Sequence, residues 1–95
     1  MRDVGVDEIR GMSVLDRNGM RLGHVKDVTF DPEAWRVTGL RVGLDREAAD
    51  RLRVPHAPLR GAELTFAADR VRSVGDAVIL NVDERGIADL MMRGS

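Results

Sequence analysis

The residues that could carry chemistry in this chain are few, and their spacing fits none of the common catalytic or metal-binding patterns. His24 and His56 are the only histidines, and the chain has no cysteine. A metal site needs several ligands that converge at fixed spacing, and neither histidine has a second ligand at such a spacing. Ser13 and Ser73 do not lie in a Gly-x-Ser-x-Gly elbow, which a serine hydrolase of that type would need. We therefore expect no enzyme activity, no metal site and no cofactor.

Two pairs of acidic residues are close enough in sequence to share a proton and act in acid–base chemistry. They are Asp27 with Asp31, and Glu47 with Asp50. Asp31 precedes a proline, where an aspartate commonly caps its own turn. Glu47 and Asp50 lie in a stretch of good helix formers, where a solvated helix face explains them. A structural role is therefore favoured for both pairs.

The glycines could in principle form a loop that cradles a phosphate at the start of a helix. Gly19, Gly23, Gly39 and Gly75 are spread over separate turns and bends. None of them belongs to a Gly-Lys-Ser/Thr or Gly-x-Gly-x-x-Gly motif. We assign them to the backbone geometry of turns and strands.

Charge is balanced, with 15 basic and 16 acidic residues and a net charge of −1. Nucleic-acid binders usually carry a basic excess on one face, because phosphate neutralisation supplies much of their affinity. One stretch from Arg41 to Arg60 is richer in arginine, but acidic residues interleave with it and no aromatic residue is there to stack on a base. No nucleic-acid partner is expected. A ribosome- or RNA-associated factor that uses residues 41–60 remains the alternative function.

Most of these residues would be positioned by β-strands. Asn18-Gly19 joins two apolar runs and is a strong signal for a tight hairpin, and Gly75-Asp76 repeats the pattern near the end of the chain. The alternation of apolar residues predicts strands at 12–16, 22–30, 35–44, 63–66, 71–74 and 77–82. Short helices are expected at 45–52 and 84–92 from their capping residues, helix formers and apolar spacing.

Two of these strands change the parity of their apolar positions part-way along. Residues 22–30 change phase near Lys26-Asp27, and residues 35–44 change phase at Gly39. A β-bulge has this effect, since one extra residue turns all later side chains to the other face. Two bent strands in succession suit a small closed barrel better than a flat sheet. The predicted fold is an all-β, six-stranded antiparallel barrel with one short internal helix and one C-terminal helix.

The turn and glycine pattern resembles the PRC-barrel domain family. The matching positions are Gly11, Asp16 to Gly19, Leu22-Gly23, Val25, Asp27-Val28, the Asp31 turn, Leu40, Val71, Val74 to Asp76, and Val78 to Leu80. The resemblance covers about residues 9–82, followed by the C-terminal helix, so residues 1–95 are expected to form one domain. Small stand-alone PRC-barrel proteins, many of them archaeal, are similar in length, and the barrel also forms half of the ribosome-maturation factor RimM. The resemblance implies a non-catalytic adaptor that binds other proteins, with a cell-division protein or a ribosomal protein as the partner.

An apolar surplus indicates where a partner would bind. In residues 77–82, alternate side chains face inward, so Ile79 must face outward. The C-terminal helix presents Ile87, Leu90 and Met91 as one apolar stripe, which could fold back on the barrel or seal a homodimer. Trp35 is either a plug at the end of the barrel or an anchor at an interface. These residues are the predicted partner or dimer interface.

A chain of 95 residues forms only a thin core. Without disulfides, such a domain gains stability from a partner or from self-association, and a homodimer is therefore expected. The absence of cysteine favours a reducing compartment, and the sequence contains no apolar run long enough to span a membrane. We expect a cytoplasmic protein.

Overall fold

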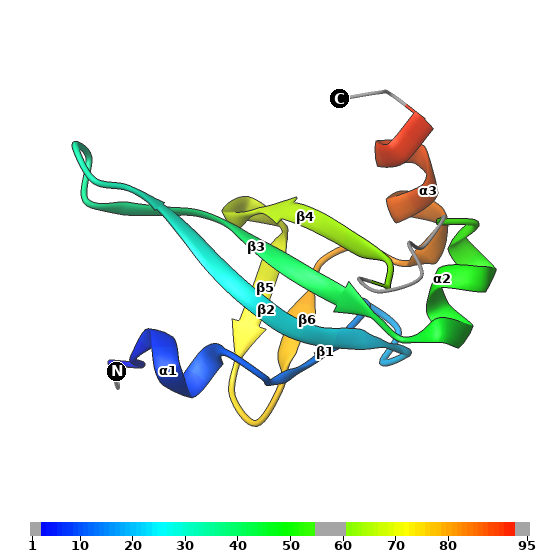
Figure 1. Cartoon of the computed structure of the whole chain (residues 1–95), viewed down its shortest axis with the longest axis horizontal. Helices are drawn as coiled ribbons and strands as arrows, with labels where there is room; N and C mark the ends of the chain where they lie inside the picture. Colours follow the sequence, from blue (N-terminus) through cyan, green and yellow to red (C-terminus); the bar gives the residue numbers. More distant parts are fainter. Residues whose placement is uncertain (1–2, 55–60, 93–95) are drawn as a thin grey trace.

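The computed structural model describes residues 3–54 and 61–92, and it has the all-β architecture that the strand pattern predicts (Figure 1). The elements in chain order are α1 (Val6–Ile9), β1 (Ser13–Leu15), β2 (Arg21–Asp31), β3 (Arg36–Leu44), α2 (Arg46–Leu52), β4 (Glu63–Ala67), the 3₁₀ turn η1 (Ala68–Arg70), β5 (Val71–Val74), β6 (Val78–Leu80) and α3 (Glu84–Met92). The six expected strands and both expected helices are present, with small differences at their ends. Helix α1 was not predicted. It forms where the Glu8 carboxylate accepts the Gly5 N–H at 3.2 Å.

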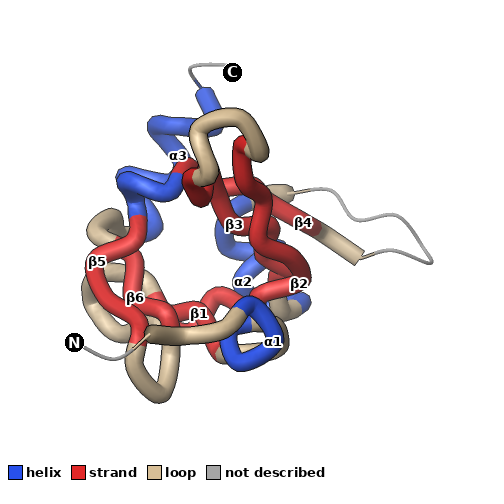
Figure 2. The backbone as a smooth tube through the Cα atoms, turned by 90° about the vertical axis from the view of Figure 1, so that its left-hand side faces the viewer, coloured by secondary structure: helices blue, strands red, loops and turns tan. Residues whose placement is uncertain are grey.

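The strands form one sheet in the order β4-β3-β2-β1-β6-β5, which curls around a common interior (Figure 2). Two details of the expected barrel need correction. Strands β1 and β6 run parallel, with Val14 opposite Val78, because the long chain between them leaves their direction free. In the described residues no ladder joins β4 to β5, so hydrogen bonding does not close the sheet. Instead, β5 pairs with β6 through the short Gly75-Asp76 turn.

The predicted bends in β2 and β3 are confirmed. The pairing of these strands slips between Val25 and Asp27, and again where Thr29 pairs with Gly39 but Phe30 pairs with Val37. Glycine is needed at position 39, because a Cβ there would lie 2.7 Å from the carbonyl oxygen of Phe66 on β4. The two bulges rotate the outer part of the hairpin relative to the part that lies in the sheet.

The β1–β2 turn is wider than the predicted two-residue hairpin. Leu15 pairs with Arg21, so residues 16–20 form the loop, and Gly19 is its one residue with a positive φ (86°). The Asp16 carboxylate is buried and accepts the N–H groups of Asn18 and Met20 at 2.8 and 2.9 Å. Because Asp16 is buried and accepts these two backbone hydrogen bonds, we assign it a structural role in capping the turn.

The core is formed by the inward side chains of the curled sheet, closed at one end by the two longer helices (Figure 1). Helix α2 buries Ala48, Ala49 and Leu52, and α3 buries Ile87. An ion pair of 2.7 Å between Arg51 and Glu84 joins the two helices. Within residues 3–54 and 61–92, no helix has the length and apolar character needed to cross a bilayer.

Candidate functional site

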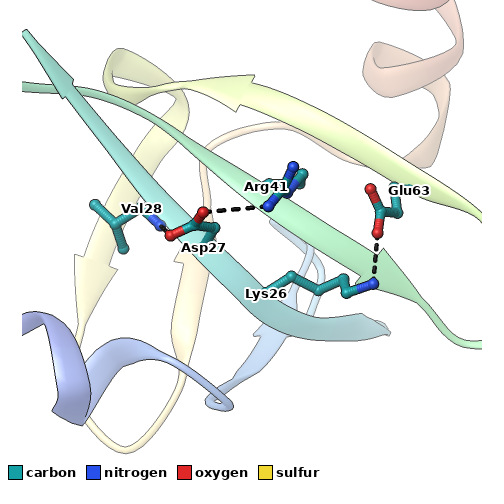
Figure 3. Close-up of polar contacts among 5 residues, drawn as sticks. All are labelled: Lys26, Asp27, Val28, Arg41 and Glu63. Carbon is teal, nitrogen blue, oxygen red and sulfur yellow. Dashed lines mark hydrogen bonds and ion pairs between the residues drawn. The ribbon is translucent and has the colours of Figure 1, made fainter. Parts of the chain in front are cut away.

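The outer face of β2, β3 and β4 carries ionisable side chains that pair with one another (Figure 3). Lys26 Nζ lies 2.5 Å from a Glu63 carboxylate oxygen, and Arg41 Nη2 lies 3.1 Å from Asp27. Asp27 also accepts the N–H of Val28 at 2.9 Å. The Arg41–Asp27 pair joins the neighbouring strands β3 and β2, and the Lys26–Glu63 pair reaches from β2 across β3 to β4. This face therefore stabilises the sheet through paired charges, each worth about 1 kcal/mol or less.

The other candidate groups for acid–base or metal chemistry are also dispersed. Asp31 caps the β2–β3 turn by accepting the N–H groups of Glu33 and Ala34 at 2.9 and 3.4 Å, as its position before a proline predicts. His24 is exposed on β2, and His56 lies outside the described residues. In the part of the chain that the structure describes, no group of three or more histidine, cysteine, aspartate or glutamate side chains could hold a metal ion.

In the described part of the stretch from residue 41 to 60, two of the four arginines face carboxylates, while Arg46 and Arg53 are exposed. Arg41 is paired with Asp27 on the sheet, and Arg51 is paired with Glu84 on α3. Arg60 lies outside the described residues.

The predicted interface residues of β6 and α3 are partly used by the chain itself. Ile79 is half-buried between the buried Val78 and Leu80, in the predicted alternation. Ile87 is only 1% exposed and belongs to the core, so it is not available to a partner. Leu90 and Met91 are half-buried and line a groove between α3 and β4. Of the two arrangements left open for this helix, the chain adopts the one in which α3 packs on its own sheet.

Three of the exposed large apolar side chains, Phe30, Trp35 and Val37, lie on the β2–β3 hairpin, which extends beyond its neighbours. Strands β2 and β3 have 11 and 9 residues, whereas the flanking strands β1 and β4 have 3 and 5. The β1 ladder reaches β2 only as far as His24, and the β4 ladder reaches β3 only from Gly39 onward. Residues 28–37, here called the arm, therefore project from the body at the end opposite α2 and α3 (Figure 1).

Trp35 occupies the end of the arm. Its side chain is 81% exposed, so it is not a plug in the barrel. Its ring meets the ring of Phe30 edge-on, with centroids 5.5 Å apart and an angle of 87° between the planes. Its backbone has a φ of 55°, in the left-handed region, which is unusual for a bulky residue and costs on the order of 1 kcal/mol.

Other apolar side chains extend this surface from the arm to α1. Phe30 and Val37 are about half exposed, and Val6 on α1 is exposed to a similar degree. Together with Val28 and Trp35 they line one shallow groove, with Arg10 and Arg36 at its rim. We call Val6, Val28, Phe30, Trp35 and Val37 the apolar patch. Exposed aromatic side chains grouped in this way are typical of protein-binding surfaces.

A family model for the PRC-barrel domain matches residues 1–87. The chain belongs to the PRC-barrel family. This match includes the whole sheet and the first part of α3, so the resemblance seen in the turns and glycines is confirmed. Among curated proteins, the search finds no match to the chain. PRC-barrel domains are a family of non-catalytic domains that mediate protein interactions.

Of the predicted interface residues, Trp35 alone lies on the arm. The sequence reasoning missed Phe30, Val37 and Val6. A signal for Phe30 and Val37 was present, since they occupy the ends of strands that overrun their neighbours and form a cross-strand pair. Val6 lies on α1, a helix that was not predicted from the sequence.

Proposed function

We propose that this PRC-barrel protein is a non-catalytic adaptor that binds another protein through the apolar patch of the arm. One observation carries the proposal: Trp35 is 81% exposed at the end of the arm, the part of the β2–β3 hairpin with which no other strand of the described chain pairs. Tryptophan is among the residues that most often dominate binding energy at interfaces. A surface of this kind suits the recognition of another protein.

The energetics of the arm support the same function. An isolated two-stranded hairpin is at best marginally stable in water. Trp35 adds an unfavourable backbone conformation and leaves most of its apolar area in solvent. Strained residues of this kind cluster at binding and active sites, where the surroundings hold them in place. A bound partner would cover the indole ring and supply the missing support.

The adaptor's partner is proposed to be a cell-division or ribosomal protein in the cytoplasm, by analogy with the small PRC-barrel proteins that the chain resembles. No observation favours the alternative in which residues 41–60 bind RNA, because Arg41 and Arg51 already face carboxylates. Binding to RNA would fall steeply with salt concentration, because each phosphate contact releases counterions. A low-salt gel-shift experiment with ribosomal RNA is expected to show no complex.

Site-specific cross-linking tests the proposed surface directly. A photo-reactive amino acid at position 37, next to Trp35 in space but not replacing it, would be activated in the protein's native cells. We expect a discrete protein adduct that mass spectrometry identifies, and that is lost when the same chain carries Trp35→Ala. The matched control is Met92→Ala, which removes a residue that is 85% exposed on α3. An adduct that persists in Trp35→Ala, or none at all, would contradict the proposed surface.

A further inference from the structure

We propose that the partner of the apolar patch is a second copy of this chain, bound arm to arm about a two-fold axis. The inference rests on the proposed function, since it names the protein that this same surface binds; a cell-division or ribosomal protein would then bind the dimer outside the apolar patch. The sequence placed the homodimer interface on the outer face of β6 and on α3, where Ile87 is buried. The proposed interface lies instead on the arm, at the other end of the molecule.

Two-fold symmetry places specific charges together. In such an interface each patch meets an identical patch in the opposite direction, so residues that follow Trp35 in one copy lie near residues that precede it in the other. Arg36 follows Trp35, and Glu33 precedes it by two positions. The Arg36 guanidinium of each copy would then lie near the Glu33 carboxylate of the other.

These two charges are available for such a contact. Arg36 and Glu33 are both exposed, and neither side chain forms an ion pair with the part of the chain that the structure describes. By contrast, Arg41 on the sheet and Arg10 on α1 each have a carboxylate nearby, at 3.1 and 3.7 Å. A surface with one free charge of each sign on either side of an exposed tryptophan is complementary to itself.

The apolar area is also large enough for a small dimer. Phe30 and Trp35, at 53% and 81% exposure, would together bury on the order of 300 Å² per copy. A second shallow groove shares Val28 and Val37 with the patch and continues to Val74 on β5. With these side chains included, two facing patches approach the roughly 1,000 Å² that a specific interface needs.

The charges make a lipid surface the poorer occupant. Aromatic side chains at a loop tip can enter the membrane interface, but anionic headgroups would repel the acidic residues of this tip. Asp31 and Glu33 both lie in the turn at the end of the arm, next to Trp35. We therefore assign the surface to a protein contact and include the membrane among the outcomes of the test.

Sedimentation equilibrium of the purified full chain tests the inference. We expect a monomer–dimer equilibrium in which Trp35→Ala raises the dissociation constant at least about 30-fold, the loss of one central anchor. Trp35→Gly, which removes the same side chain but suits the backbone better, should have the same effect, so poor folding cannot explain the result. Met92→Ala should leave the equilibrium unchanged.

Charge reversal tests the two-fold arrangement. Arg36→Glu and Glu33→Arg should each raise the dissociation constant by roughly 3- to 10-fold, since each places like charges together at two symmetric positions. The double variant should return to within about 3-fold of the wild type, because the pairs form again with reversed sign. Additive weakening in the double variant would overturn this arrangement of the copies.

The outcomes separate this inference from the proposed function. A chain that stays monomeric at about 1 mM, while position 37 still cross-links to a different protein, overturns the second copy and leaves the adaptor function standing. A dimer that Trp35→Ala does not weaken overturns the arm as the contact. Trp35-dependent binding to phosphatidylglycerol vesicles by a monomeric chain would overturn both in favour of a membrane surface.

Discussion

Gly23 lies where β2 passes very close to β3, at the end of the hairpin that is next to α2 and opposite the arm. A Cβ at position 23 would overlap the carbonyl oxygen of Gly43 and lie 2.9 Å from the Cα of Leu44. Both obstacles are backbone atoms, which cannot rotate away as a side chain can. We expect Gly23→Ala to lower the free energy of unfolding by about 3 kcal/mol.

Urea unfolding followed by circular dichroism measures this effect. Gly75→Ala is the matched control, because Gly75 has no atom within 4 Å of its added Cβ and no positive φ. It should change the free energy of unfolding by about 0.5 kcal/mol or less. Equal stability of the two variants would mean that β2 and β3 do not approach each other at this point.

Trp35 illustrates a residue whose role the sequence could not decide. A large aromatic side chain near a strand end fits either the interior of a small barrel or an interface. Its exposure depends on how far β2 and β3 extend beyond β1 and β4, that is, on where the pairing with these two strands stops. The sequence shows that Trp35 is a large aromatic residue, but whether it is exposed depends on the lengths of the strands around it.

The elements themselves were largely predictable, because their signals are local. Alternation with a period of two identified the strands, and the change of parity identified the bulge at Lys26-Asp27 and the bend at Gly39. The parallel pairing of β1 with β6 and the missing β4–β5 ladder were not predictable. No short turn connects β1 with β6. Both features depend on how strands that are separated in sequence meet once β2 and β3 have bent.

Helix α3 contributes to stability through one buried side chain. Ile87 is 1% exposed in the core, whereas Met92 on the same helix is 85% exposed. We expect Ile87→Ala to lower the free energy of unfolding by about 2–4 kcal/mol, since it leaves a cavity, and Met92→Ala to change it by about 0.5 kcal/mol or less. Thermal and urea unfolding of both variants measure the difference. If Ile87→Ala were neutral, α3 would not be held by its own sheet.

The two ends of the described molecule differ in how far their apolar side chains are covered. Helices α2 and α3 close one end of the core, and the arm leaves its aromatic side chains exposed at the other (Figure 1). Association through the arm would complete the molecule by covering the exposed end, so stability and recognition would draw on the same surface.

This coupling predicts that thermal stability depends on protein concentration. If folded chains associate into dimers and unfolded chains do not, a higher protein concentration raises the melting temperature by mass action. For a domain of this size 1 kcal/mol corresponds to roughly 4–8 °C, so we expect the melting temperature to rise by about 5 °C between about 2 and 200 μM protein. Scanning calorimetry at several concentrations, with reversibility checked by a second scan, provides the measurement.

The variants of the arm give this prediction its control. Trp35→Gly should melt at a temperature that does not depend on concentration, because it lacks the central contact but keeps an accessible backbone conformation at a position with a φ of 55°. Met92→Ala should show the same concentration dependence as the wild type, because its side chain lies on α3 at the far end from the arm. A wild-type melting temperature that is constant across this range would mean that association through the arm does not stabilise the fold. The strain at Trp35 would then have to be balanced within a single chain.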